Sequence, residues 1–423
     1  MRRRLLAIVC VSASLVSGCG LLPGSDSDRR TVTVWLMKDS ASQEFLDRFT
    51  EDFEKQNPDF ALDIQIQQWT GIGPKVEEAL KPGTDDNDNA DGPDVIEVGN
   101  TQVPTYVDGG RLLDLTLESV RDWGSKDWLP GLAEPGQLRS HQYGIPWYAA
   151  NRVVIYRKDL FEQAGITDVP KDREEWLAAT EELNTDGNQG IYLAGQDWYT
   201  LAGFIWDEEG DLAVENGAVW EGSLDTPEAL DGMEFYQELQ GLGAGPVDAD
   251  EQNPPLTDVF AKGQVAQIIA VPGSAQAILD SNPDLKGKLG YFPVPGKTAD
   301  EPGAVFTGGS DLIIPRHADE RDGAIAVIEM LSGAKWNAEL ARTMNYVPNK
   351  ASLASALSGE EGAAAMAEGA AQGRATPSTP EWSKVEADNP IKTYMTKVLT
   401  GTDPQTAAEQ ASNEITEALS SPG

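Results

Sequence analysis

Histidine is scarce in this chain of 423 residues, which contains only His141 and His317. A Ser-His-Asp triad needs a histidine as its base, and many zinc sites are built from several histidine ligands. Histidine triads and histidine-rich metal sites are therefore nearly excluded. We predict that the protein binds no metal and needs no cofactor.

Two segments imitate ligand-binding motifs but fail on spacing. The residues PGKT at 295–298 resemble the end of a phosphate loop, but Tyr291 stands where its first glycine is required. The acidic segment 85–94 has the wrong register for an EF-hand, because a start at Asp85 places Ala90 at the position of the obligatory glycine. We interpret this segment as a solvated acidic loop, in which weak cation binding stays open.

Basic residues are also few. The chain has 32 Lys and Arg but 69 Asp and Glu, so its net charge is −37. This charge argues against nucleic acid and anionic lipid as partners, because both are negative themselves. It also disfavours a small anionic ligand, although a local pocket could differ from the protein as a whole.

Cysteine is almost absent, and both cysteines lie in the N-terminal segment MRRRLLAIVCVSASLVSGCG. Three arginines open this segment, and the apolar run 5–16 that follows is too short to span a bilayer as a mature helix. The residues VSGC at 16–19 resemble the lipobox of bacterial lipoproteins. The resemblance implies a signal peptide at 1–18 and a lipid on Cys19, and the alternative is an ordinary secretory signal with an incidental cysteine.

If the signal peptide is removed, Cys10 leaves with it and no thiol remains for a disulfide, a metal or a nucleophile. Several acyl chains on Cys19 would hold the protein stably at the outer face of the cytoplasmic membrane. No other run of eighteen apolar residues exists, so we expect the lipid to be its only membrane anchor. The Gly, Pro, Ser and Asp residues in 19–30 predict a flexible tether.

The mature chain begins with a β-α-β-α-β pattern. Residues 31–37, 61–69 and 93–99 are typical of strands, and 42–58 and 74–81 are typical of helices. This order favours a parallel sheet with right-handed crossovers. From Asp322 onward the pattern is nearly all helical.

Seven segments then occur in an order that identifies a family. They are TVWLMKDSASQEFLDRFTEDFEKQNPDF, GPDVIEVGN, YGIPWYAANRVVIYRKDLFEQAGI, FAKGQVAQIIAVPGS, LGYFPVPG, GGSDLIIP and MNYVPNKASL. Together they resemble the extracellular solute-binding proteins of bacterial ABC importers, in the carbohydrate-binding group that includes maltose-binding protein. The resemblance covers nearly the whole mature chain, and it is specific for the family but weak for the identity of the sugar.

The resemblance implies an α/β fold of two lobes, each a mostly parallel sheet flanked by helices. It places a ligand cleft between the lobes and a helical C-terminal third. The implied N-lobe comprises 31–148 with 292–335, and the implied C-lobe comprises 149–291 with 336–423.

The first crossover between the lobes matches the stretch that contains Trp147, Tyr148 and Asn151. We predict that these residues lie at the floor of the cleft. A pyranose has apolar C–H faces that stack on aromatic rings, while planar polar side chains bind its hydroxyls. The alternative is that Trp147 and Tyr148 are core or hinge residues.

The other predicted ligand contacts follow from their positions in the family pattern. They are Asp39, Trp69, Asn100, Gln102, Trp198, Tyr199, Gly273, Ser274, Gly309, Ser310, Asp311 and Trp382. Several of them have an ordinary structural alternative. Asp39 could cap a helix, the tryptophans could pack in the core, and Asn100, Gln102 and Asp311 could form turns.

We therefore predict a lipid-anchored, monomeric substrate-binding subunit of an ABC sugar importer. It would close on a di- or oligosaccharide by hinge bending and deliver it to a membrane permease, without chemistry of its own. The overall sequence resembles binders of N-acetylglucosamine and chito-oligosaccharides, while maltose, trehalose and cello-oligosaccharides stay open as ligands. The alternative function is a secreted glycosidase with paired carboxylates, which would more often be a (β/α)8 barrel.

Overall fold

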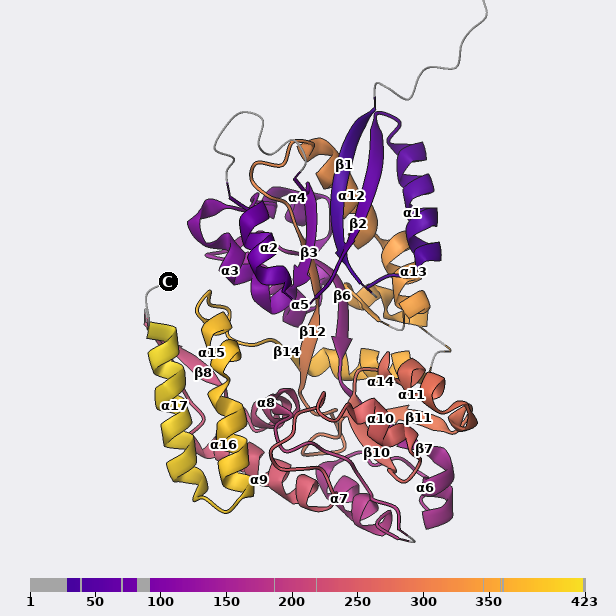
Figure 1. Cartoon of the computed structure of the whole chain (residues 1–423), viewed down its shortest axis with the longest axis vertical. Helices are drawn as coiled ribbons and strands as arrows, with labels where there is room; N and C mark the ends of the chain where they lie inside the picture. The colour runs from indigo at the N-terminus through magenta and orange to yellow at the C-terminus, as the bar shows by residue number, and fades with distance from the viewer. Residues whose placement is uncertain are drawn as a thin grey trace, which may run out of the picture.

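The computed structural model describes residues 29–420 apart from 39, 70, 82–91, 186, 218, 345, 358 and 360. The predicted signal peptide, the lipidation site Cys19 and the candidate contact Asp39 therefore lie outside the described residues. Figure 1 shows two lobes, which we call the N-lobe and the C-lobe, joined by strands that run through a narrow waist. Within the described residues, none of the helices combines the length and the apolar character of a membrane span.

The N-lobe is built on one sheet with the strand order β13-β6-β12-β3-β1-β2, to which β14 is added beside β12. These strands are β1 (Arg30–Met37), β2 (Phe60–Gln67), β3 (Val95–Gly99), β6 (Ile145–Asn151), β12 (Val305–Ile313), β13 (Val347–Pro348) and β14 (Gly373–Arg374). Strands β2, β1 and β3 are parallel, as the β-α-β-α-β pattern predicts. Strands β6 and β12 are antiparallel, because β6 leaves the N-lobe and β12 enters it.

Helices cover both faces of this sheet, because side chains of β1 alternate between two apolar clusters. Val34 and Leu36 belong to the cluster beneath α1, whereas Trp35 and Met37 belong to the cluster beneath α2 and α3. The N-lobe helices are α1 (Gln43–Gln56), α2 (Ile72–Ala79), α3 (Val103–Val107), α4 (Thr116–Arg121), α5 (Pro130–Ala133), α12 (Arg321–Ser332) and α13 (Ala334–Met344), with the small hairpin β4 (Gln137–Leu138) and β5 (His141–Gln142).

The C-lobe contains a three-stranded sheet in the order β10 (Gln267–Ala270), β7 (Val153–Arg157) and β11 (Leu289–Phe292). Its strands are antiparallel, since β7 runs away from the waist and both neighbours run back toward it. The predicted two-lobed α/β fold is confirmed. The expected mostly parallel sheets are not found in both lobes, because the C-lobe sheet is antiparallel and the parallel strand pairs of the described sheets are β2-β1, β1-β3 and β12-β14.

Helices surround this smaller sheet and supply most of the C-lobe core. They are α6 (Lys158–Ala164), α7 (Arg173–Glu182), α8 (Trp198–Asp207), α9 (Pro227–Gly241), α10 (Leu256–Ala261), α11 (Ser274–Ser281), α14 (Glu361–Gly369), α15 (Trp382–Asp388), α16 (Pro390–Leu399) and α17 (Pro404–Ser420), with the hairpin β8 (Ala213–Asn216) and β9 (Val219–Gly222). In Figure 1, α14 and α15 lie at the level of the waist.

The contacts shift the predicted lobe boundaries. The first crossover falls at Arg152, between β6 and β7, a few residues beyond the predicted boundary at 148. The second falls within β12 rather than at 292, because Phe306 still packs in the C-lobe core and Leu312 packs in the N-lobe core. Helix α13 belongs to the N-lobe and not to the predicted C-lobe segment 336–423, since Trp336 meets the ring of Phe45 edge-on at 5.3 Å.

Candidate functional site

The first crossover strand, β6, carries a β-bulge at its two adjacent aromatic residues. Ser310 of β12 lies opposite Tyr148, and the following Asp311 lies opposite Pro146, so that Trp147 is an extra residue on β6. A bulge interrupts the alternation of side chains along a strand. Both aromatic rings consequently join the N-lobe core, with their centroids 5.1 Å apart.

Trp147 occupies the core position that was the alternative to its predicted place in the cleft. Its side chain has no exposed surface, and its carbonyl accepts a hydrogen bond from Asn337. A ring without an exposed face offers a sugar nothing to stack on. We therefore leave Trp147 out of the candidate site.

Two predicted asparagine contacts are also buried. Asn151 donates from Nδ2 to the carbonyl of Met366 at 3.0 Å and thereby fastens the crossover to α14. Asn100 donates to the carbonyls of Gly131 at 3.0 Å and Thr307 at 3.1 Å. These bonds connect backbone segments at the waist, although Asn151 Oδ1 is buried without a partner in the described part of the chain.

Asp311 and Gly309 are likewise enclosed by the N-lobe. Within the described residues neither carboxylate oxygen of Asp311 has a hydrogen-bond partner, and burial raises its pKa well above the ordinary value. A Cβ atom added at Gly144 would lie 2.6 Å from Asp311 Oδ2, so the carboxyl is enclosed. A Cβ atom at Gly309 would lie 2.2 Å from the carbonyl oxygen of Tyr148, which makes glycine necessary where β12 passes β6.

A cluster of hydroxyl groups surrounds one buried carboxylate where β1, β3, β6 and β12 meet. Oε1 of Glu97 lies 2.7 Å from Ser40 Oγ, 3.0 Å from the Tyr148 hydroxyl and 2.6 Å from Ser310 Oγ. Its Oε2 accepts from the backbone N–H of Met37 at 2.6 Å. Burial raises the pKa of Glu97, while these donors oppose the rise. We call Ser40, Glu97, Tyr148 and Ser310 the N-lobe polar cluster.

The N-lobe polar cluster includes two predicted contacts, Tyr148 and Ser310, and borders a third. Ser40 directly follows Asp39, which lies outside the described residues. The ring of Tyr148 stacks on Tyr346 with a centroid distance of 4.1 Å and an interplanar angle of 9°. Glu97 thus holds an aromatic pair and the end of β1 in fixed positions.

A second cluster lies just across the crossover and consists of charged side chains. Arg152 is only 8% exposed, and its Nη2 lies 2.6 Å from Glu251 Oε2. Its Nε lies 3.9 Å from Asp197 Oδ1, and its guanidinium carbon is 4.6 Å from the ring centroid of Tyr199. We call Arg152, Asp197, Tyr199 and Glu251 the C-lobe charged cluster.

The start of α8 positions two members of this cluster. Asp197 is the N-cap, and its Oδ1 accepts the backbone N–H of Thr200 at 3.3 Å. Burial raises the pKa of Asp197 to about 6, although the nearby Arg152 favours the charged form. Tyr199 begins the first turn and stays partly exposed, whereas the adjacent Trp198 is buried in the C-lobe core.

Two cavities meet at Glu251. One of about 500 Å³ is lined by Arg152 and Glu251 together with Ser274 at the start of α11. The other, of about 140 Å³, is lined by Asp197, Tyr199 and Glu251. The predicted contacts Tyr199 and Ser274 therefore border two cavities that share Glu251 as a lining residue, and Gly273 is the residue before α11.

Helix α15 carries a further acid, the partly exposed Glu386. Trp382 is buried, and its Nε1 donates to Glu386 Oε1 at 3.1 Å. Among the charged neighbours that raise the pKa of Tyr199, Glu386 comes first. The carbonyl of Pro380, just before α15, accepts from the Thr105 hydroxyl of α3 at 3.4 Å. This segment of the C-lobe is therefore in contact with the N-lobe.

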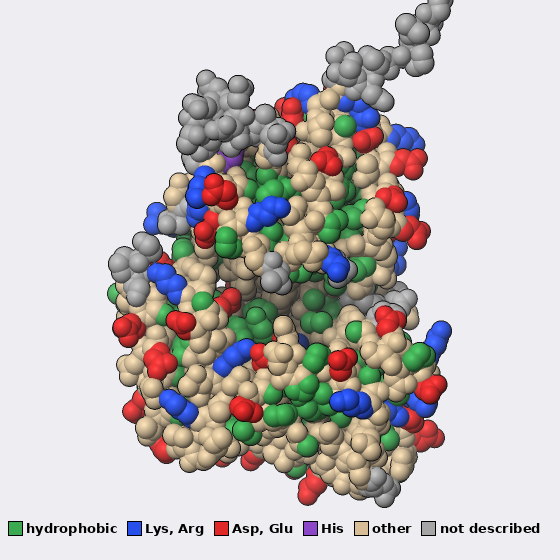
Figure 2. All heavy atoms as spheres, viewed as in Figure 1, with side chains coloured by type: hydrophobic (Ala, Val, Ile, Leu, Met, Phe, Trp, Pro, Cys, Tyr) green, Lys and Arg blue, Asp and Glu red, His purple; other side chains and the backbone are tan. Residues whose placement is uncertain are grey.

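The crossover strand links the two clusters. Tyr148 lies on β6, and Arg152 directly follows the end of β6, so one stretch of chain carries a member of each cluster. Four residues of extended chain span about 13 Å, which places the clusters within reach of one ligand of two or more rings. Figure 2 shows the molecular surface hollowed at the waist, with hydrophobic side chains at the bottom of the hollow.

Two remaining candidates differ in exposure. Trp69 follows β2 and is 42% exposed. Gln102 ends the short turn after β3 and is partly exposed, although its Oε1 is buried without a partner in the described part of the chain. Their proximity to the clusters stays a prediction.

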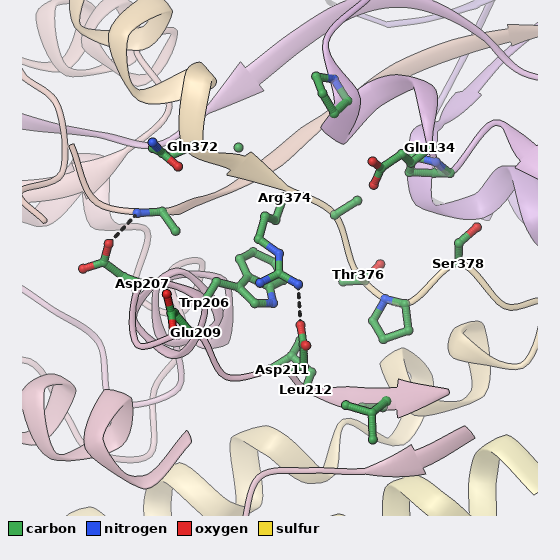
Figure 3. A pocket seen from close by; sticks show the side chains of 18 of the residues that line it. Glu134, Trp206, Asp207, Glu209, Asp211, Leu212, Gln372, Arg374, Thr376 and Ser378 are labelled. Atoms are coloured by element: carbon green, nitrogen blue, oxygen red, sulfur yellow. Dashed lines mark hydrogen bonds and ion pairs between the residues drawn. The ribbon is translucent and has the colours of Figure 1, made fainter. Parts of the chain in front are cut away.

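A larger groove of about 920 Å³ opens at the other end of α8 (Figure 3). Glu134 and Pro135 of the N-lobe form one side of this groove. Trp206 lies across from them, but the guanidinium of Arg374 covers its ring at 5.5 Å and pairs with Asp211 at 2.5 Å. Trp206 is only 5% exposed and therefore offers little ring surface for stacking, whereas Trp220, which also lines the groove, is partly exposed.

The model of the bacterial extracellular solute-binding protein family matches residues 37–338. The chain belongs to this family. It is 35% identical to the diacetylchitobiose-binding protein DasA of Streptomyces coelicolor over 434 aligned residues, which cover 99% of each chain. It is 25% identical to a mannitol-binding protein of Pseudomonas aeruginosa, with coverage of 75% and 72%.

Solved structures of sugar-binding proteins share the fold. The sugar-binding protein MalE of Xanthomonas citri superposes with a TM-score of 0.80 at 24% identity, covering 92% of this chain and 97% of that one. The GacH receptor of Streptomyces glaucescens superposes with a TM-score of 0.74 at 22% identity, covering 93% and 100%. The predicted family and the two-lobed fold are confirmed, and the protein is a bacterial extracellular solute-binding protein.

Sequence reasoning missed Glu97, Arg152, Glu251 and Glu386. Arg152 offered a signal, since it interrupts an otherwise apolar run at the crossover. Glu97 offered a similar signal, since it interrupts the apolar strand VIEVG, whereas Glu251 and Glu386 offered none in a chain with 69 acidic residues.

Proposed function

We propose that this protein captures an N-acetylated disaccharide or short oligosaccharide of the diacetylchitobiose type between its lobes. The proposal rests on two clusters at the waist, the N-lobe polar cluster and the C-lobe charged cluster. The first includes Tyr148 of the crossover strand β6, and the second includes Arg152, which directly follows β6. The whole-length similarity to the diacetylchitobiose-binding protein DasA supports this class of sugar.

Hinge closure would complete the binding site. The N-lobe polar cluster is itself buried and fixes the stacked pair Tyr148 and Tyr346, of which Tyr346 is partly exposed. The C-lobe charged cluster places Tyr199 and Glu251 beside a cavity, so neither lobe would supply the whole site. A ligand that contacts both lobes binds the closed state more tightly and shifts the population toward it. The closed complex would then be recognised by the membrane permease of the importer.

We propose that the site binds sugar without cleaving it. Glycosidases need one carboxyl group as an acid and a second as a nucleophile or base. Here Glu251 pairs with Arg152 at 2.6 Å, and Asp197 caps α8 while lying near the same guanidinium. Carboxylates engaged in this way are suited to hold a ligand rather than to transfer protons.

Thermal melting against a sugar panel tests the proposed ligand. The soluble part from Asp26 onward should melt at a higher temperature with diacetylchitobiose, because a ligand that binds only the native state stabilises it by mass action. Maltose, trehalose and cellobiose serve as comparisons. A larger shift with any of these three would assign the protein to a different sugar.

Membrane attachment through Cys19 is a separate part of the proposal, since the residue lies outside the described structure. In a bacterial host the Cys19→Ala variant is expected to lose labelling by fatty acids and to leave the membrane fraction, because the acyl chains are the only proposed anchor. Cys10→Ala is the matched control and should behave like the parent. Full membrane retention of Cys19→Ala would refute the anchor.

A further inference from the structure

The groove of about 920 Å³ at the far end of α8 has an excess of negative charge. Among the described residues that line it, the acids are Glu134, Asp207, Glu209, Asp211, Glu215 and Glu301, and the bases are Lys297 and Arg374. Acids come from both lobes, since Glu134 directly follows α5 of the N-lobe and Glu209 lies just after α8 of the C-lobe. A cleft lined mainly by one sign of charge attracts ligands of the opposite sign, so this groove favours a cation.

One cation of the chain itself shows how the groove holds such a group. The guanidinium carbon of Arg374 lies 5.5 Å from the ring centroid of Trp206, and its Nη2 lies 2.5 Å from Asp211 Oδ1 (Figure 3). An aromatic ring and a carboxylate together stabilise a cation, through cation–π attraction and ion pairing. Asp207 is likewise neutralised, because Arg173 pairs with it at 2.8 Å. The chain therefore occupies these two acids with its own arginines.

The hairpin of β8 and β9 repeats the combination of an aromatic ring and a carboxylate, but without a cation. Glu215 and Trp220 are directly opposite each other in this hairpin, so their side chains project from the same face. Both line the groove, where Glu215 is exposed and Trp220 is partly exposed. Within the described residues no lysine or arginine covers the ring of Trp220 or pairs with Glu215. This pair is therefore left for a cation from outside the chain.

A hydroxyl group in the same groove also has no partner. Thr376 is only 5% exposed, yet it lines the groove, and its hydroxyl forms no hydrogen bond with the described residues (Figure 3). Polar groups held out of bulk water normally have a hydrogen-bond partner, so this one is suited to a ligand. A bare metal ion is disfavoured, because the described acidic, histidine and cysteine side chains do not gather in threes as a metal site requires. Carboxylates spread along a groove suit a larger organic cation.

We propose that this groove is a second binding site, which takes an organic ligand with primary ammonium groups. An ammonium group would lie against the ring of Trp220 and pair with Glu215, and Thr376 would hydrogen-bond another polar group of the ligand. Amino sugars and linear polyamines share this chemistry. The site goes beyond the proposed function, because diacetylchitobiose carries acetamido groups and has no ammonium group.

The experiment is calorimetry on the processed chain, purified in detergent, with two probes: chitobiose, the disaccharide of glucosamine, and spermidine. The parent should bind at least one of them, and Glu215→Gln should weaken that binding about threefold, since it removes the charge but keeps the shape. The double variant of Glu215→Gln with Trp220→Ala should weaken it about tenfold, equal to about 1.4 kcal/mol. Added salt should weaken binding more in the parent than in Glu215→Gln, because it screens the ion pair. Glu221→Gln, on the same hairpin but outside the groove, is the matched control and should bind like the parent.

The two probes distinguish the two sources of such a ligand. An affinity for chitobiose that falls in the variants supports the site and assigns it to amino sugars, and one for spermidine that falls supports it and assigns it to linear polyamines. A parent that binds neither probe, or variants that bind both probes as the parent does, would overturn the inference. Diacetylchitobiose is titrated in parallel, and its affinity should be equal in the parent and in Glu215→Gln. A parent that does not bind diacetylchitobiose would overturn the proposed function and leave this inference standing.

Discussion

Replacement of Arg152 by methionine is expected to weaken diacetylchitobiose binding about a hundredfold, which corresponds to about 2.7 kcal/mol. The guanidinium is nearly buried, lies 2.6 Å from Glu251 and covers the ring of Tyr199. Its removal takes away a donor to the ligand and leaves neighbouring carboxylates without their cation. Breaking a buried ion pair by removing one partner costs about 3–5 kcal/mol of folding free energy, so the melting temperature should fall as well.

The loss of stability in Arg152→Met should grow with pH. Burial raises the pKa of Asp197 to about 6 even with Arg152 nearby, and loss of the cation raises it further. A carboxyl group whose folded-state pKa exceeds its unfolded value stabilises the fold less as pH rises through the folded pKa. The difference in melting temperature between parent and variant should therefore be larger at pH 8 than at pH 5.

A second buried arginine serves as the control for this prediction. Arg157 ends β7, away from the crossover, and its Nε donates to Asp159 at 2.7 Å. Arg157→Met should lower the melting temperature yet leave the affinity for the sugar unchanged. Parental affinity in Arg152→Met, measured by calorimetry on folded protein, would remove the C-lobe charged cluster from the site.

Trp147→Ala is expected to cost about 3–5 kcal/mol of stability, the usual penalty for truncating a large core aromatic. The ring has no exposed surface and packs within the N-lobe core. Tyr199→Ala should behave in the opposite way, because Tyr199 borders a cavity and its loss should weaken binding by about 1–3 kcal/mol with little change in the unliganded melt.

Both variants should be melted without ligand and titrated with it. Trp198→Ala is a useful companion, since Trp198 is buried beside Tyr199 and should lose stability as Trp147→Ala does. A Trp147→Ala protein that melts like the parent but no longer binds sugar would show that Trp147 contacts the ligand and is not a core residue.

The contrast between Trp147 and Tyr199 shows what the sequence could and could not predict. The crossover was placed within a few residues, because the residues around it form a recognisable family pattern. The orientation of Trp147 depends on a bulge, and the bulge exists only because β6 pairs with β12, more than 150 residues later in the chain. Local alternation alone cannot supply that information.

The polar contacts illustrate the same limit. Ser310 and Asp311 are neighbours in one predicted motif, yet the hydroxyl of Ser310 joins Glu97 at 2.6 Å while the carboxyl of Asp311 is enclosed near Gly144. Arg152, Asp197 and Glu251 come from three distant segments and meet near Tyr199 only in the folded protein. Motifs identified the family and the waist, and tertiary structure was needed to select the side chains.

Small-angle scattering with and without diacetylchitobiose tests the central claim most directly, namely that one ligand bridges both lobes and closes the hinge. The account predicts a smaller radius of gyration at saturating sugar, and no change with a sugar that does not shift the melting temperature. A saturating concentration of diacetylchitobiose that raises the melting temperature but leaves the scattering profile unchanged would contradict closure of the two lobes around the ligand.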